Sequence, residues 1–372
     1  MTMRRDAEFD AEVDASHSLT IEGVSVRVSD ALAGLPETYA QVRLVWQERR
    51  EEEFRNRVTW EYPFPIAVRF HRASQQVEYS RRLEHLRDTW HAAITLAAAV
   101  VLAEIVHKGI DAAAFGIDPG KLTFHNIRNP IDILDRCVLG CGNRLSIFSG
   151  LGPEEMKEAI SLMVELNNER NGLAHVEALP ENHAKERFKY CEPKVMRILS
   201  LLRNLANGDL VSVADVDKLH YHRGISPEAS TRSVALAEAQ YLQLHAPGRP
   251  PKRDLFWLEE GGAYCLSPLL RRADAEDSQQ FRLFFLDDVK TEERRLVYLT
   301  YGFITRCDTA DAKPGFHTTA VLEDRDVLLV DYENLRDRFR SKTRTPKRKP
   351  HSAPPQATGE QQKGRILRLA RS

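Results

Sequence analysis

A short polar segment near the middle of the chain carries residue types that suit chemistry on a phosphodiester: Arg170, Asn171 and His175. A neutral imidazole near pH 7 can take the proton from a ribose 2′-hydroxyl, and a guanidinium gives phosphate oxygens a permanent positive charge and paired hydrogen bonds. We therefore predict that His175 is the base or acid and that Arg170 stabilises the charge that develops on phosphorus. Asn171 would orient the phosphate or the imidazole, and Glu169 would position Arg170 or repel misplaced anions.

A helix predicted over residues 153–174 must position this segment, because its apolar residues follow helical spacing: Met156, Ile160, Met163 and Leu166. On an ideal helix Asn171 and His175 share a face, whereas Arg170 lies about 140° from His175. Gly172 costs about 1 kcal/mol in a helix relative to alanine. A glycine among polar residues at the end of an apolar helix indicates a site rather than a core.

The pattern Arg170-Asn171-x-x-x-His175, at the end of a helix in a helical bundle, resembles the HEPN family. That family is defined by an Arg followed after four to six residues by a His, with a polar residue, often Asn, after the Arg. Its members are four- or five-helix bundles that usually dimerise and bring two motifs into one cleft. Many are metal-independent endoribonucleases of toxin–antitoxin and anti-phage defence systems.

The resemblance covers residues 75–207 and implies that Arg170 and His175 are catalytic and Asn171 supports them. It also implies a hydrolase that binds RNA, acts as a homodimer and needs neither a metal nor a cofactor. An antitoxin or another defence-complex subunit would be its partner. Glu177 stands where some members carry a modifiable Tyr, so control by that modification is not expected.

Other interpretations of the same residues remain open at the level of sequence. Short motifs arise by chance, and the chain holds another such spacing between Arg344 and His351. At an ordinary helix end, His175 would interact with the helix dipole and Arg170 would form a surface ion pair. Inactive HEPN-like scaffolds also exist, so a partner-binding subunit without activity is the main alternative to an enzyme.

The C-terminal segment is strongly basic. Residues 340–372 contain ten Lys and Arg and one acid, Glu360, which leaves a net charge of about −10 on the rest of the chain. Basic arms of this kind contact nucleic acid, membranes or acidic partners, although a solvated solubility tail is equally compatible. We predict nonspecific phosphate contacts from four of these residues: Arg344, Lys347, Arg348 and Lys349.

The predicted fold class is α+β, with an N-terminal helical bundle of four to six helices, a small β-rich module and a disordered basic tail. Helical spacing recurs in residues 36–57, 74–108, 129–138, 153–174 and 183–207. A Pro-rich linker over residues 246–252 precedes strand-like runs at residues 255–258, 263–266, 281–286, 295–301 and 327–330. The predicted division is a disordered segment 1–18, a helical domain 36–246, a β-rich module 254–335 and a tail 336–372.

Other features argue against alternative classes. The five cysteines do not form a disulfide framework, and neither Cys137 with Cys141 nor His220 with His222 has a second pair at metal-site spacing. The most apolar stretch, residues 92–103, is too short to span a bilayer and suits a buried helix. Without a signal peptide, the chain is expected in the cytoplasm with no membrane association.

Overall fold

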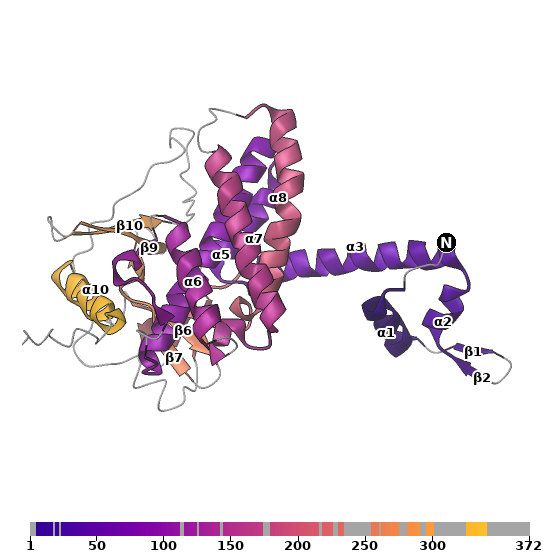
Figure 1. Ribbon diagram of the computed structural model, residues 1–372, viewed down its shortest axis with the longest axis horizontal. Coiled ribbons are helices and arrows are strands. Elements are labelled where there is room, and N and C mark those ends of the chain that lie inside the picture. The colour runs from indigo at the N-terminus through magenta and orange to yellow at the C-terminus, as the bar shows by residue number, and fades with distance from the viewer. Residues whose placement is uncertain are drawn as a thin grey trace, which may run out of the picture. The chain divides into compact units, whose positions relative to one another are not determined.

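The chain folds into a mixture of helices and strands, which agrees with the α+β class in its general form. The computed structural model describes residues 5–340 except residues 18, 22–23, 112–114, 125, 142–143, 174–178, 216–217, 226–229, 234–253, 260–261, 275–280, 291–294 and 301–324. Within these residues, helices come first along the chain and most strands follow them (Figure 1).

A helical bundle surrounds one long apolar helix. Its members are α4 (Phe64–Gln75), α5 (Tyr79–His107), α6 (Arg128–Cys141), α7 (Pro153–Leu173) and α8 (Glu181–Leu201). Helix α5 packs against α4, α6 and α8, and α7 packs against α6 and α8. The helix predicted over residues 74–108 is confirmed as α5, apart from its first residues, which belong to the end of α4 and the connection after it. Helix α4 itself was not predicted.

Helix α5 has the length and composition of a membrane span, but 89% of its most apolar window is buried inside the protein. Every residue from Ala92 to Ile105 is buried. Burial of apolar surface stabilises a fold by roughly 25 cal/mol per Å². Helix α5 is therefore the core helix that the sequence predicts.

The N-terminal residues form structure where disorder was predicted. Helix α1 (Ala7–Ser16) precedes the antiparallel pair β1 (Leu19–Ile21) and β2 (Val24–Val26), the short helix α2 (Val28–Ala33) and the long helix α3 (Pro36–Glu61). The prediction of disorder is wrong for residues 7–16, because their partners lie elsewhere in the chain. The Phe9 ring is fully buried, with ring centres 5.1 Å from Tyr39 and 5.4 Å from Trp46.

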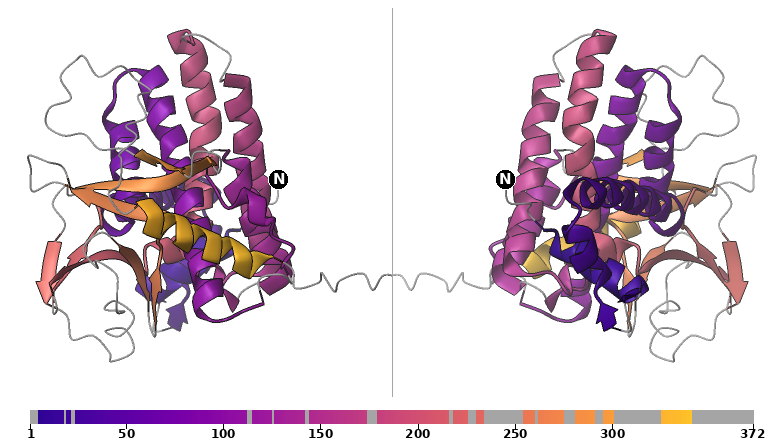
Figure 2. Two further views of the ribbon diagram at one scale, coloured as in Figure 1. Left: turned by 90° about the vertical axis from the view of Figure 1, so that its left-hand side faces the viewer. Right: turned by 90° about the vertical axis from the view of Figure 1, so that its right-hand side faces the viewer.

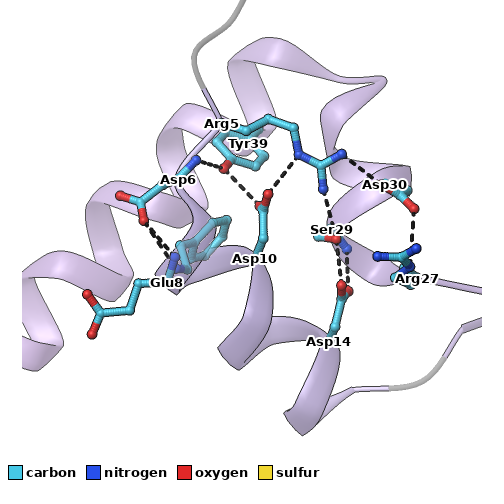
Figure 3. Close-up of polar contacts among 10 residues, drawn as sticks. Arg5, Asp6, Glu8, Asp10, Asp14, Arg27, Ser29, Asp30 and Tyr39 are labelled. Carbon is cyan, nitrogen blue, oxygen red and sulfur yellow. Dashed lines mark hydrogen bonds and ion pairs between the residues drawn. The ribbon is translucent and has the colours of Figure 1, made fainter.

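Polar contacts fix the same helix (Figure 3). Arg5 bridges Asp10 and Asp30, each at 2.7 Å, and the Asp14 carboxylate accepts hydrogen bonds from the backbone and hydroxyl of Ser29 at 2.8 and 2.7 Å. The Ser29 contacts lower the pKa of Asp14. Such long-range contacts leave no local periodic signal, so the sequence pattern could not reveal them.

Within the described residues, the strands form two antiparallel sheets besides the β1–β2 pair. One sheet has the order β5-β4-β3-β6-β7, from β3 (Asp209–Asp215), β4 (Lys218–Tyr221), β5 (Ser230–Ser233), β6 (Leu255–Glu259) and β7 (Gly262–Cys265). The other has the order β10-β9-β8, from β8 (Leu270–Asp274), β9 (Phe281–Lys290) and β10 (Arg295–Thr300). The hairpin predicted around residues 259–262 is confirmed as β6–β7.

The predicted boundary between a helical domain and a β-rich module is wrong. Strand β3 pairs with β6, so one sheet joins residues on both sides of the predicted linker, which lies outside the described residues. Trp257 and Phe285 of the sheets share one apolar core with the bundle. A Cβ at Gly208 would lie 2.2 Å from the Trp257 ring, so a glycine is needed there. The described residues up to Arg340 form one compact unit.

The last described element is helix α10 (Arg325–Phe339), which corrects two further predictions. Residues 327–330 are helical rather than a strand, and residues 336–339 belong to this helix rather than to a disordered tail. A four-residue apolar run is compatible with either structure. The buried residues of the whole segment recur at helical spacing: Leu329, Tyr332, Leu335 and Phe339.

Candidate functional site

The polar segment begins in the last turn of α7, as predicted. Helix α7 starts at Pro153 and ends at Leu173, and it includes positions 170 and 171. His175 lies outside the described residues, as do the side chains of Arg170 and Asn171. The backbone therefore shows that positions 170 and 171 lie in the last turn of α7. The described side chains around this turn define its surroundings.

The buried face of α7 changes from apolar to polar towards this end. Met163 and Leu166 are buried in the core, and Asn167 comes next on the same face with only 5% of its surface exposed. Positions 170 and 171 follow Asn167 by three and four residues, so they continue that face on an ideal helix. The amide of Asn167 is not among the buried side-chain groups of the described residues that lack a hydrogen-bond partner, so it meets solvent or a polar neighbour at this end of α7. A polar residue at this point of the buried face is compatible with a polar site.

A second face of α7 is tied to α8 by charged side chains. Glu158 accepts two hydrogen bonds from Arg197, at 2.8 and 2.7 Å, and these bonds lower the pKa of Glu158. Glu165 pairs with Lys194, which lowers the pKa of this carboxyl. These contacts recur along the two antiparallel helices and hold the polar end of α7 against α8.

Glu169 belongs to this row of contacts, because it forms an ion pair with Arg187 of α8. The Arg170 side chain lies outside the described residues, so the predicted action of Glu169 on Arg170 stays a prediction. What the structure adds is that the pair with Arg187 fixes the last turn of α7 against α8.

The start of α8 is also fastened to the start of α5. The Glu181 carboxylate accepts hydrogen bonds from the backbone nitrogens of Tyr79 at 2.5 Å and Ser80 at 3.3 Å. Such a carboxylate satisfies backbone groups that a helix N-terminus leaves open. The end of α7, the start of α8 and the turn between α4 and α5 consequently lie at one end of the bundle (Figure 2).

The sequence prediction missed a second arginine–histidine pair. The Arg69 guanidinium lies 3.3 Å from Nδ1 of His85 and 3.5 Å from the Asp88 carboxylate. Burial, followed by the charge of Arg69, lowers the pKa of His85 to about 4. This imidazole is neutral at pH 7. Because the two residues are sixteen positions apart, on α4 and α5, a search for short motifs does not find them.

Other candidate groups have structural roles. Burial raises the pKa of the Cys191 thiol to about 11, so this thiol is not an activated nucleophile. His222 is buried, and its Nε2 lies 2.9 Å from the Ser212 hydroxyl. Burial holds the pKa of His222 well below its ordinary value. The described residues contain no cluster of three or more His, Cys, Asp or Glu that could hold a metal ion.

A cavity of about 360 Å³ lies beside the start of α6, away from the motif. Its lining includes charges of both signs: Asp118, Lys121, Arg128, Asp132, Asp135 and Arg136. Asp132 already pairs with Arg128 at 3.0 Å and with Lys121 at 3.8 Å. This balanced charge offers no preference for a phosphate, so the end of the bundle remains the better candidate.

The predicted contacts of Arg344, Lys347, Arg348 and Lys349 fall outside the described residues. No family model matches the chain, and no curated protein or solved structure is significantly similar to it. The fold and the site define an α+β protein with a polar helix end beside a tightly anchored helical hairpin. The resemblance to the HEPN family stays a prediction that rests on the motif alone.

Proposed function

We propose that this protein is a metal-independent endoribonuclease of the HEPN type, with its site at the C-terminal end of α7. One observation carries the proposal: the apolar face of α7 gives way to the nearly buried polar residue Asn167, and the helix continues through positions 170 and 171. A helix that only packed against the core would carry apolar residues to its end, so polar residues in its last turns depart from the local pattern. Such departures are typical of functional sites.

The proposed reaction is an internal transesterification of RNA. His175 takes the proton from a 2′-hydroxyl, the 2′-oxygen forms a bond to phosphorus, and the bond from phosphorus to the 5′-oxygen breaks. A proton from an imidazolium neutralises the leaving oxygen, which leaves a 2′,3′-cyclic phosphate. Arg170 stabilises the additional negative charge on the phosphorane. In a homodimer, the second copy of the motif supplies the second imidazole.

The test is incubation of purified protein with bulk RNA in the presence of EDTA, beside a folded Arg170→Ala/His175→Ala variant. Cleavage by the wild type alone supports the proposal and places the site on this helix. Equal cleavage by both proteins contradicts it. The products must carry 2′,3′-cyclic phosphate ends, which separates this mechanism from metal-dependent hydrolysis.

A second candidate function, a partner-binding scaffold, is favoured by the uncovered face of α3. The side chains of Leu44 and Val45 on this helix are 56% and 63% exposed. Exposed apolar groups that cluster in this way are typical of protein–protein contacts. A dimer that binds a partner and leaves RNA intact, both alone and in that complex, would favour the scaffold.

If the protein is an enzyme, we propose that it acts in the cytoplasm as a toxin or an anti-phage effector.

A further inference from the structure

The end of the bundle that carries the motif also carries two cations on aromatic rings. The Arg82 guanidinium of α5 lies 4.2 Å from the Phe188 ring and 4.9 Å from the Tyr79 ring. The Lys185 ammonium of α8 lies 5.5 Å from the same Tyr79 ring. Among the described residues, neither Arg82 nor Lys185 forms an ion pair with a carboxylate.

This lack of neutralisation is unusual for the surrounding surface. Two neighbouring arginines do have carboxylate partners: Arg81 pairs with Glu78 at 3.1 Å, and Arg187 pairs with Glu169. Outside its basic C-terminal segment, the chain has a net charge of about −10, so acidic groups are plentiful. Two like charges held over one ring repel each other, and a bound anion would relieve this repulsion.

The fold holds the two cations in place. The Arg82 Nε donates a hydrogen bond to the Ala73 carbonyl at 3.2 Å, and Glu181 ties the start of α8 to the start of α5. Because both cations lie over the Tyr79 ring, their charges are no more than about 10 Å apart. Two cations this close can contact neighbouring phosphates of one strand.

The start of α8 connects these cations with the motif. Lys185 and Phe188 lie on the side of α8 that contacts α5, whereas Arg187 lies on the side that contacts α7. We propose that Arg82 and Lys185 form a phosphate-binding surface that guides single-stranded RNA across the start of α8 to positions 170 and 171. The choice of RNA as the ligand rests on the proposed function, but phosphate binding by these two cations does not.

The experiment measures binding of the full chain to 2′-O-methyl RNA, which lacks the 2′-hydroxyl nucleophile and stays intact. The Arg82→Gln/Lys185→Gln variant removes both charges. Loss of two single-strand phosphate contacts should reduce the slope of log K against log salt by about 1.4. The Arg82→Lys/Lys185→Arg variant keeps both charges and should keep the slope, which separates charge from packing on Phe188.

A matched control carries the same charge change elsewhere. Arg49 and Lys157 are exposed and already pair with Glu53 and Glu154, so Arg49→Gln/Lys157→Gln should leave the slope unchanged. An equal loss in both variants, no loss in either, or no binding by the wild type would overturn the inference. If the wild type binds through these cations but never cleaves natural RNA, the surface stands and the proposed catalysis fails. If RNA cleavage is confirmed and the Arg82→Gln/Lys185→Gln variant binds RNA as the wild type does, the proposed catalysis stands and the phosphate-binding surface is refuted.

Discussion

Replacement of Asn167 by leucine should make the protein more stable and less active. The Asn167 side chain is 95% buried on the core-facing side of α7, because only 5% of its surface is exposed. Leucine has a similar size and no polar atoms, so it adds apolar surface to a position that faces the core. Because the Asn167 amide is not an unpaired buried group, we expect the free energy of unfolding to rise by only about 0.5–1 kcal/mol. For a unit of this size, Tm would then rise by about 1 °C.

The same substitution should reduce RNA cleavage about 10- to 100-fold, because the amide lies one helical turn before positions 170 and 171. This loss corresponds to roughly 1.4–2.8 kcal/mol of transition-state stabilisation. A gain in stability with a loss of activity is the pattern expected of a polar residue kept for function. Urea unfolding and an initial-rate cleavage assay on the same preparation measure the two effects.

A matched control exists in the core of α5. Thr95 is fully buried, and its hydroxyl has no hydrogen-bond partner. Thr95→Val removes a buried polar group far from the motif, so it should stabilise the fold and leave cleavage unchanged. If Asn167→Leu instead destabilises the protein, or cleaves RNA at the wild-type rate, the assignment of this face of α7 to a site is refuted.

Three further outcomes are expected. Glu169→Gln should reduce cleavage by no more than about threefold, since its carboxylate contacts Arg187 in an exposed pair worth about 0–1 kcal/mol. Arg170→Ala should abolish cleavage. Equal losses in the two variants would show a direct role for Glu169. Arg271→Met should cost about 3–5 kcal/mol in urea unfolding because it leaves Asp254 charged and buried, and a double replacement of Asp254 and Arg271 by apolar residues should cost much less. Burial and Arg69 lower the pKa of His85 to about 4, below its unfolded value of about 6.5, so unfolding free energy should fall as pH drops between these values. Partial exposure limits this fall to about 1–2 kcal/mol, and His85→Gln should remove it; an unchanged pH dependence in that variant would contradict the assignment.

The helical periodicity of the chain was informative where burial is continuous. Helix α7 was predicted to within one residue, and the burial of α5 was correct from Ala92 onward. In such helices the spacing of the apolar residues follows from contacts with the core that repeat every three or four residues. The short run at residues 327–330 shows the limit of the same reasoning, since four apolar residues fit a strand as well as a helix.

The domain boundary failed for a different reason. Strand β3 carries too short an apolar pattern to be separated from the helices before it, and its partner β6 lies more than forty residues later. Pairing between distant strands is a tertiary property that local composition does not encode. The Pro-rich run marks a chain connection, but it does not mark the edge of a core.

The site itself was predictable in part, because residue chemistry is visible in a sequence and electrostatic neighbours are not. The order of polar types around Arg170 was apparent, whereas the pairing of Glu169 with Arg187 depends on the hairpin geometry. That pairing has a consequence for tests of the proposed chemistry. Because Arg187 holds the Glu169 carboxylate, a substitution at Glu169 acts through the hairpin and not through the proposed chemistry. The comparison of Glu169→Gln with Arg170→Ala measures this difference.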